Sequence, residues 1–148
     1  MKCMDIKFSI SAKSESATRV AVKARNFTMY VDEPPQLGGD DRGANPVEYV
    51  LAALAGCLNV VGNLVAKEMD VKLQDLLIEI EGTLNPAKFQ GKSSEERAGY
   101  KQINVKMKVK TDASPEILEK WLKTVEERCP VSDNLSNPTP LKITFEKF

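Results

Sequence analysis

The chain has 148 residues, enough for one domain with a substantial core. Its 21 basic residues balance its 21 acidic ones, so charge gives no reason to expect binding to nucleic acid or to an anionic membrane. The lack of histidine excludes Cys–His and Ser–His catalysis, and three cysteines without a close pair argue against a disulfide framework. The N-terminus lacks the apolar core of a secretory signal, so we expect a cytoplasmic protein.

The first part of the chain predicts antiparallel strands followed by a loop. Apolar residues alternate with polar ones over residues 4–10, which predicts a half-buried strand, and the polar residues 13–17 predict a turn. A second strand begins near Val20. The apolar positions then change parity, which predicts a turn or bulge near Arg25–Asn26 before a third strand. Residues 32–44 hold two prolines and three glycines and are predicted to form a loop.

The longest apolar segment, residues 45–70, predicts a central helix. Asn45 is a favourable N-cap, Pro46 suits the first helical position, and Glu48 stands at the capping-box position. Apolar side chains occupy both flanks of this helix, but one small sheet covers only one side. We therefore expect two copies of the helix to pack on each other in a two-fold homodimer. Polar interruptions such as Asn59 argue against a membrane span.

After the central helix the pattern predicts two strands, a helix and a last strand. Alternating residues over 76–81 and 103–110 predict one-sided strands. A Ser-Pro pair at residues 114–115 predicts the start of a helix, which Pro130 ends. Apolar residues alternate again over residues 141–145. The order β-β-β-α-β-β-α-β predicts an α+β fold with antiparallel sheet, and no linker divides the 148 residues, so we expect a single domain.

Two of the three cysteines are candidate functional residues. Cys57 lies in the middle of the central helix, where the helix dipole does little to lower the pKa of a thiol. It is either a small buried hydrophobe or a thiol whose pKa a nearby cation lowers. Cys129 is either the end of an apolar stripe or a second thiol that the fold brings to Cys57, and Cys3 is expected to be incidental. Scattered cysteines without histidine predict no metal site. The loop 38–43 lacks the Lys-Ser/Thr of a phosphate-binding loop and predicts a tight turn.

Two segments resemble the OsmC/Ohr family of organic hydroperoxide reductases. They are residues 32–57, DEPPQLGGDDRGANPVEYVLAALAGC, and residues 127–132, ERCPVS, and the likeness extends over residues 19–148. The resemblance implies an intertwined α+β homodimer with two sites at its interface. It implies that Cys57 is the peroxidatic cysteine and Cys129 the resolving one, and that an arginine and a glutamate assist them.

The resemblance leaves the arginine and the glutamate to be assigned. Arg19 and Arg25 both precede the loop, and Arg25 is preferred because it lies at the strand irregularity and closer to the loop. In the branch with the clearest peroxidase activity a glutamate directly follows the helical proline. Here Val47 takes that place and Glu48 follows, as in the OsmC-like branch. Glu48 is either only a helix cap or a residue that holds the arginine beside the partner's Cys57, because it lies on the opposite side of its own helix.

The implied reaction is a thiol-dependent reduction of organic hydroperoxides. The Cys57 thiolate attacks the peroxide, releases an alcohol and becomes a sulfenic acid, which condenses with Cys129 to a disulfide. An external dithiol then reduces this bond, and no bound cofactor is required. Apolar neighbours such as Leu54 favour bulky organic peroxides. The alternatives are a non-catalytic dimer that binds an apolar ligand or senses redox state, and a structural dimer with inert thiols.

Overall fold

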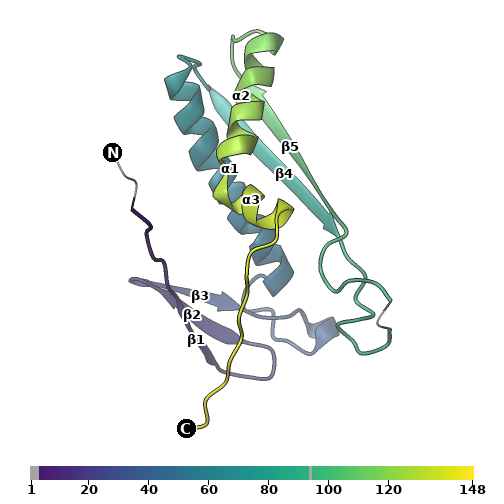
Figure 1. Cartoon of the computed structure of the whole chain (residues 1–148). Helices are drawn as coiled ribbons and strands as arrows, with labels where there is room; N and C mark the ends of the chain where they lie inside the picture. Colours follow the sequence, from purple (N-terminus) through teal and green to yellow (C-terminus); the bar gives the residue numbers. More distant parts are fainter. Residues whose placement is uncertain (1–3, 94) are drawn as a thin grey trace. The chain divides into compact units, whose positions relative to one another are not determined.

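The computed structural model describes residues 4–93 and 95–148, and it confirms the α+β class with antiparallel sheets and a long helix (Figure 1). Cys3 lies outside the described residues. Two compact units divide the chain, up to Val50 and from Leu51 onward. The long helix α1 (Pro46–Glu68) begins in the first unit and continues in the second. That all 148 residues form one domain stays a prediction.

The first unit contains an antiparallel sheet with the strand order β1-β2-β3: β1 (Ser11–Ser14), β2 (Val20–Ala24) and β3 (Phe27–Val31). The β2–β3 pairing ends with Ala24 opposite Phe27, which leaves Arg25 and Asn26 as a two-residue turn. Arg25 adopts a left-handed backbone with φ of 54°. Left-handed turn residues suit a two-residue hairpin because they match the twist of the flanking strands. The predicted parity change near Arg25 is thus confirmed as a hairpin turn.

The first predicted strand is wrong. Residues 4–10 belong to no strand. The turn predicted over residues 13–17 is confirmed only in its later part, because β1 continues to Ser14 and the chain bends after it before β2 begins. All four apolar side chains of residues 4–10 are exposed: Met4, Ile6, Phe8 and Ile10. Alternation is a necessary property of a half-buried strand, but a strand also needs a hydrogen-bonded neighbour, which the pattern does not supply.

The start of α1 is built as the sequence predicts. The Glu48 N–H donates to Asn45 Oδ1 over 2.9 Å, and the Asn45 N–H donates to Glu48 Oε2 over 2.8 Å. This reciprocal pair is a capping box, which satisfies two N–H groups at the helix start. The Glu48 side chain is therefore engaged at the end of its own helix.

The second unit packs a two-stranded sheet against helices, with elements β4 (Asp75–Thr83), β5 (Gln102–Lys110), α2 (Pro115–Arg128) and α3 (Pro130–Ser136) besides α1. β4 and β5 pair along their whole length, from Asp75 opposite Lys110 to Thr83 opposite Gln102. The buried core is formed by one face of α1 and by α2: Leu54, Leu58, Val61, Val65, Ala66, Trp121, Val125 and Cys129. Apolar residues of the sheet, such as Ile78 and Met107, pack against this core.

The end of the chain departs from the prediction in two ways. Pro130 ends α2 as predicted but also begins α3, because proline is as favourable at the first position of a helix as it is unfavourable inside one. Residues 141–145, predicted as a strand, belong to none, and Leu141, Ile143 and Phe145 are exposed. The reason is the same as at the start of the chain, since no described strand pairs with this segment.

Within the described residues, α1 is the one helix long and apolar enough to cross a membrane by length and composition. The core helix of a soluble protein meets the same criterion, and Leu58 and Val65 on one face of α1 are buried in the second unit. On another face Val60 and Leu64 are exposed. One face of this helix therefore has no cover within the unit.

A candidate dithiol site

The second unit brings two of the predicted site residues together. The Sγ atoms of Cys57 and Cys129 lie 3.0 Å apart although 72 positions separate them in the chain. Both are free cysteines; Cys57 is partly exposed on α1, whereas Cys129 is fully buried. A pair of thiols at this separation can form a disulfide after a shift of about 1 Å, because an S–S bond is about 2 Å long.

The α2–α3 junction holds the thiol of Cys129 in place. Cys129 ends α2 with an extended backbone and serves as the N-cap of α3. Its Sγ accepts a hydrogen bond from the Ser132 N–H at 3.4 Å, and Val131 offers its backbone N–H to the Cys57 sulfur. Pro130 has no N–H to leave unpaired at this junction. Two successive N–H groups after the proline therefore face the two sulfurs.

Burial, not charge, dominates the titration of Cys57. Burial raises the pKa of the Cys57 thiol above its ordinary value, and the neighbouring Cys129 sulfur raises it further. The Val131 N–H lowers this pKa but does not reverse the rise. A positive group near Cys57 would lower this pKa and favour the thiolate.

A close contact between α1 and α2 supports the thiol pair. The buried indole of Trp121 donates a hydrogen bond to the Gly62 carbonyl over 2.8 Å. A Cβ atom at Gly62 would lie 3.2 Å from this ring, so the contact depends on the missing side chain. Gly62 follows Cys57 on α1 and Trp121 precedes Cys129 on α2, so the contact constrains the spacing of the helices that carry both thiols.

The predicted arginines and Glu48 lie in the first unit, whereas both thiols lie in the second. Arg25 is exposed at the β2–β3 turn, with its guanidinium 5.1 Å from the centre of the Phe27 ring. Arg19 is partly buried and makes two ion pairs, with Glu15 at 3.2 Å and with Asp40 at 3.1 Å. Glu48 is used in the capping box. The assisting roles of these residues stay predictions.

Sequence reasoning missed the organising residue of the loop that precedes α1. Asp32 is fully buried and accepts hydrogen bonds from the Thr18 hydroxyl and from the backbone N–H groups of Glu33, Asp40 and Arg42. Burial alone would raise the pKa of Asp32, but these four donors together hold it below its ordinary value. The sequence signal for this role is an aspartate close to a Pro-Pro-x-x-Gly-Gly segment, because aspartate carboxylates accept hydrogen bonds from the backbone N–H groups of such turns.

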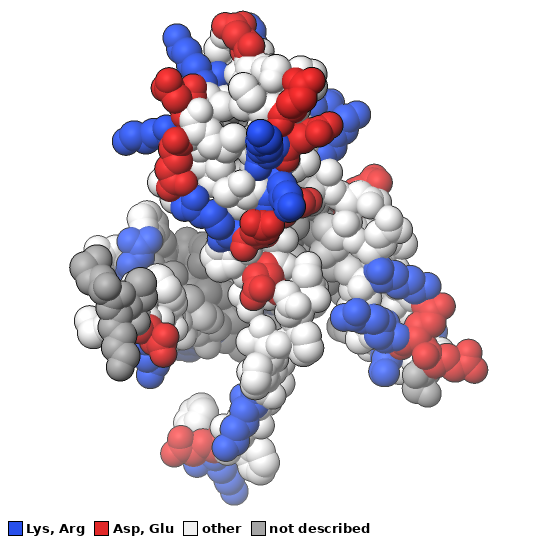
Figure 2. Space-filling model, turned by 45° about the horizontal axis from the view of Figure 1, so that its top comes forward, with Lys and Arg blue, Asp and Glu red and all other residues white. Residues whose placement is uncertain are grey.

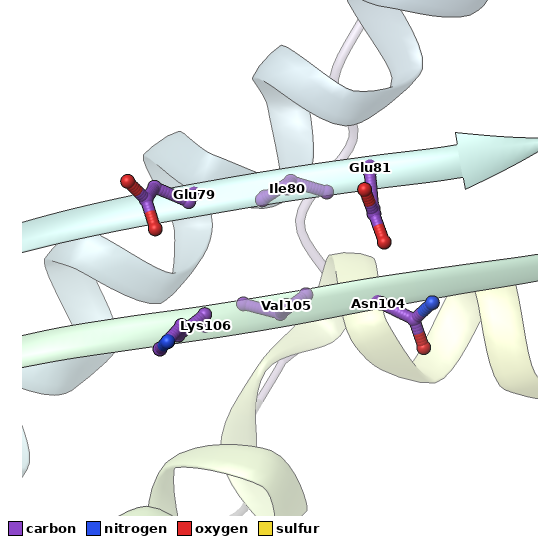
Figure 3. Close-up of a pocket in the computed structure, with 6 residues that line it drawn as sticks. All are labelled: Glu79, Ile80, Glu81, Asn104, Val105 and Lys106. Atoms are coloured by element: carbon purple, nitrogen blue, oxygen red, sulfur yellow. The ribbon is translucent and has the colours of Figure 1, made fainter.

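Other surfaces of the described residues offer less for chemistry. A hollow of about 480 Å³ lies on the β4–β5 sheet, where Figure 3 shows Glu79, Glu81, Asn104 and Lys106 along the two strands. Neither thiol lines it. No group of three or more potential metal ligands occurs in the described part of the chain. On the face shown in Figure 2, basic and acidic side chains are intermixed, so this face presents no region of a single charge.

Comparison with known families decides the identity of the fold. The model of the OsmC-like protein family matches residues 38–144, most of the chain. This chain belongs to the OsmC-like family. A hydroperoxide reductase of Mycoplasma genitalium is 26% identical over 144 residues, which are 96% of both chains. A hydroperoxide reductase of Mycoplasma pneumoniae is 24% identical and covers 95% of this chain and 94% of its own.

Solved structures show the same OsmC-like fold. An OsmC-like protein from Mycoplasma pneumoniae superposes with a TM-score of 0.78 at 22% identity, covering 90% of this chain and 89% of its own. An organic hydroperoxide resistance protein from Elizabethkingia anophelis superposes with a TM-score of 0.64 at 21% identity, with the same coverage. At this level of identity, the two solved structures show that the chain shares the fold of these proteins.

Proposed function

We propose that this protein reduces organic hydroperoxides to alcohols with Cys57 as the attacking thiol and Cys129 as the resolving one. The observation that carries the proposal is the pair of sulfurs 3.0 Å apart, of which only Cys57 is partly exposed. A peroxide reaches the exposed sulfur, and the buried sulfur is shielded from solvent but adjacent to the sulfenic acid that forms. An external dithiol, in the reducing cytoplasm that we expect for this protein, closes the cycle by thiol–disulfide exchange.

The chemical steps balance without a cofactor. The Cys57 thiolate bonds to one peroxide oxygen, the O–O bond breaks, and the alkoxide leaves as an alcohol after taking a proton. The Cys129 thiol then attacks the sulfenic sulfur and water leaves. The external dithiol becomes a disulfide and returns both cysteines to thiols.

A cation would favour the thiolate at Cys57, and two arginines are candidates. Arg25 is the residue that the sequence favours, but its guanidinium stacks on Phe27 at an exposed turn. Arg19 is held by Asp40 at the loop that precedes α1, so it is the better preorganised of the two and the one we now favour. A glutamine substitution at each position compares them: loss of Arg19 should slow the reaction with peroxide, and loss of Arg25 should slow it less.

A homodimer is the second part of the proposal. Two segments with alternating apolar residues, 4–10 and 141–145, are exposed and unpaired, and Val60 and Leu64 of α1 are exposed as well. Exposed apolar surface of this extent on a single chain is typical of an interface. Sedimentation at low micromolar concentration should find a dimer and no folded monomer; a stable folded monomer would exclude it.

The decisive experiment is peroxide consumption with a dithiol reductant. Cys57→Ser should abolish turnover, which would separate the peroxidase from a ligand-binding or structural dimer. Cys129→Ser should allow one turnover and then stop, unless the reductant attacks Cys57 directly. Normal multiple turnover by Cys129→Ser with a dithiol that cannot reach Cys57 would contradict the resolving role.

A mixed dimer tests whether Glu48 acts across the interface. One chain carries Cys57→Ser and the other Glu48→Ala. If Glu48 serves the partner's Cys57, one site has both defects and the other none, so about half the activity survives. If Glu48 only caps its own helix, the Glu48→Ala homodimer keeps its activity and loses stability instead.

A further inference from the structure

Gly62 is the point at which α1, α2 and the second sheet meet. The Trp121 indole N–H donates to its carbonyl over 2.8 Å, and Trp121 is only 2% exposed. A Cβ atom at Gly62 would lie 3.2 Å from the indole ring, 3.6 Å from Met107 and 3.8 Å from Leu76 of the sheet. A buried N–H that leaves its acceptor loses its hydration without compensation, so the ring is held at this carbonyl.

The residue that Gly62 holds lies on the same side of α2 as the buried thiol. Trp121, Val125 and Cys129 recur at every fourth position, and all three are buried in the core. Trp121 and Cys129 are separated by two turns of helix, about 12 Å, and Cys57 precedes Gly62 by about 7.5 Å along α1. The hydrogen bond at one end and the two sulfurs at the other therefore join the same two helices at two points.

A second link between α1 and α2 lies at the surface. Arg128 donates to Glu68 over 3.1 Å, and these two side chains are 40% and 49% exposed. Ion pairs with this exposure are screened by solvent and contribute little to holding two elements in register. The buried link through Trp121 is consequently the one that fixes α2, and with it Cys129, against α1.

The distance between the two sulfurs matters most after the first chemical step. The sulfenic acid at Cys57 has two possible fates. The Cys129 thiol attacks its sulfur and water leaves, or a second hydroperoxide transfers an oxygen to it, releases an alcohol and leaves a sulfinic acid, which thiols do not reduce. The outcome depends on how constantly Cys129 lies within bonding distance, because misplacement by 1 Å can slow such a step by up to about a hundredfold.

We propose that Trp121 is a positioning residue of the resolving step: its hydrogen bond to Gly62 keeps Cys129 at the sulfur of Cys57, so that the disulfide closes before a second peroxide reacts. This inference rests on the proposed function. It assigns Trp121 no part in the attack on the first peroxide, since its hydrogen bond constrains the spacing of the helices and supplies no charge to Cys57.

Trp121→Phe tests the proposal, because it keeps an aromatic ring and removes the N–H. In a single turnover with an organic hydroperoxide, followed by quenching and mass spectrometry, the closure of the Cys57–Cys129 disulfide should slow about tenfold. The share of chains that gain two oxygen atoms at Cys57 should rise. The rate at which the Cys57 thiol disappears should stay within about twofold of the parent, because the first step does not use Cys129. A loss of folded protein alone would lower the amplitude of both steps and leave their ratio unchanged.

Glu68→Gln is the matched control, since it removes the exposed link between the same two helices. It should keep the closure rate within about twofold of the parent. Equal slowing by Glu68→Gln, or a Trp121→Phe protein with the parent closure rate and sulfinic acid yield, would overturn the proposal. Should Trp121→Phe not fold, Gly62→Ala decides, because its Cβ displaces the indole ring and should slow closure as well.

Failure of the peroxidase itself is separately visible, because Cys57→Ser would then consume peroxide as fast as the parent. The positioning role is still measurable in that case with oxidised glutathione, which forms a mixed disulfide with Cys57 and is released as a thiol when Cys129 attacks. This closure should also be about tenfold slower in Trp121→Phe than in the parent. Equal rates with oxidised glutathione would overturn the positioning role whatever the peroxide assay finds.

Discussion

Oxidation of the Cys57–Cys129 pair should stabilise the protein by an amount that follows from its place in the chain. The two cysteines are 72 positions apart, so a bond between them closes a long loop in the unfolded chain. The loss of chain entropy for a loop of this length corresponds to about 4 kcal/mol at 25 °C. Because the sulfurs already lie 3.0 Å apart, we expect little native-state strain to reduce this gain.

Urea unfolding of the oxidised and the reduced protein measures this difference. The oxidised protein should unfold at a higher urea concentration, and its Tm should rise by about 10 °C. Cys129→Ser, treated with the same oxidant, should show no such shift. A loss of 2 Da per chain should accompany the change, without covalent dimers on a non-reducing gel. Equal stability of the oxidised and reduced forms, or a cross-link between chains, would refute the intramolecular pairing.

Three further changes test the first unit. Asn45→Ala should lower the free energy of unfolding by about 1 kcal/mol in urea titrations, because the capping box is lost. Asp32→Asn should make the stability less dependent on pH. The pKa of Asp32 is lowered in the folded protein, so this residue adds stability above the pKa of the unfolded chain, and that stability is lost as the pH falls through the folded pKa. Acid titration followed by circular dichroism should show the difference between the variant and the parent. Gly39→Ala should destabilise the loop, because its Cβ would overlap the Glu33 carbonyl, and a lowered Tm would show it.

Much of the fold is encoded in local signals. The cap at Asn45, the turn at Arg25 and the start of α2 after Ser114 depend on residues within a few positions of one another, and the structure has all three. Alternation of apolar and polar residues also predicts β4 and β5 from local sequence, because successive side chains of a strand point to opposite faces and their polarity shows which face is buried.

The failures came where structure depends on distant residues. Residues 4–10 and 141–145 have the alternation of strands, but pairing requires a neighbour that their own sequence does not specify. Pro130 predicts the end of α2 from its local sequence, but the same proline also begins α3, and the stop signal alone does not reveal this start. The meeting of Cys57 with Cys129 depends on the packing of α1 against α2, which no spacing along the chain could predict.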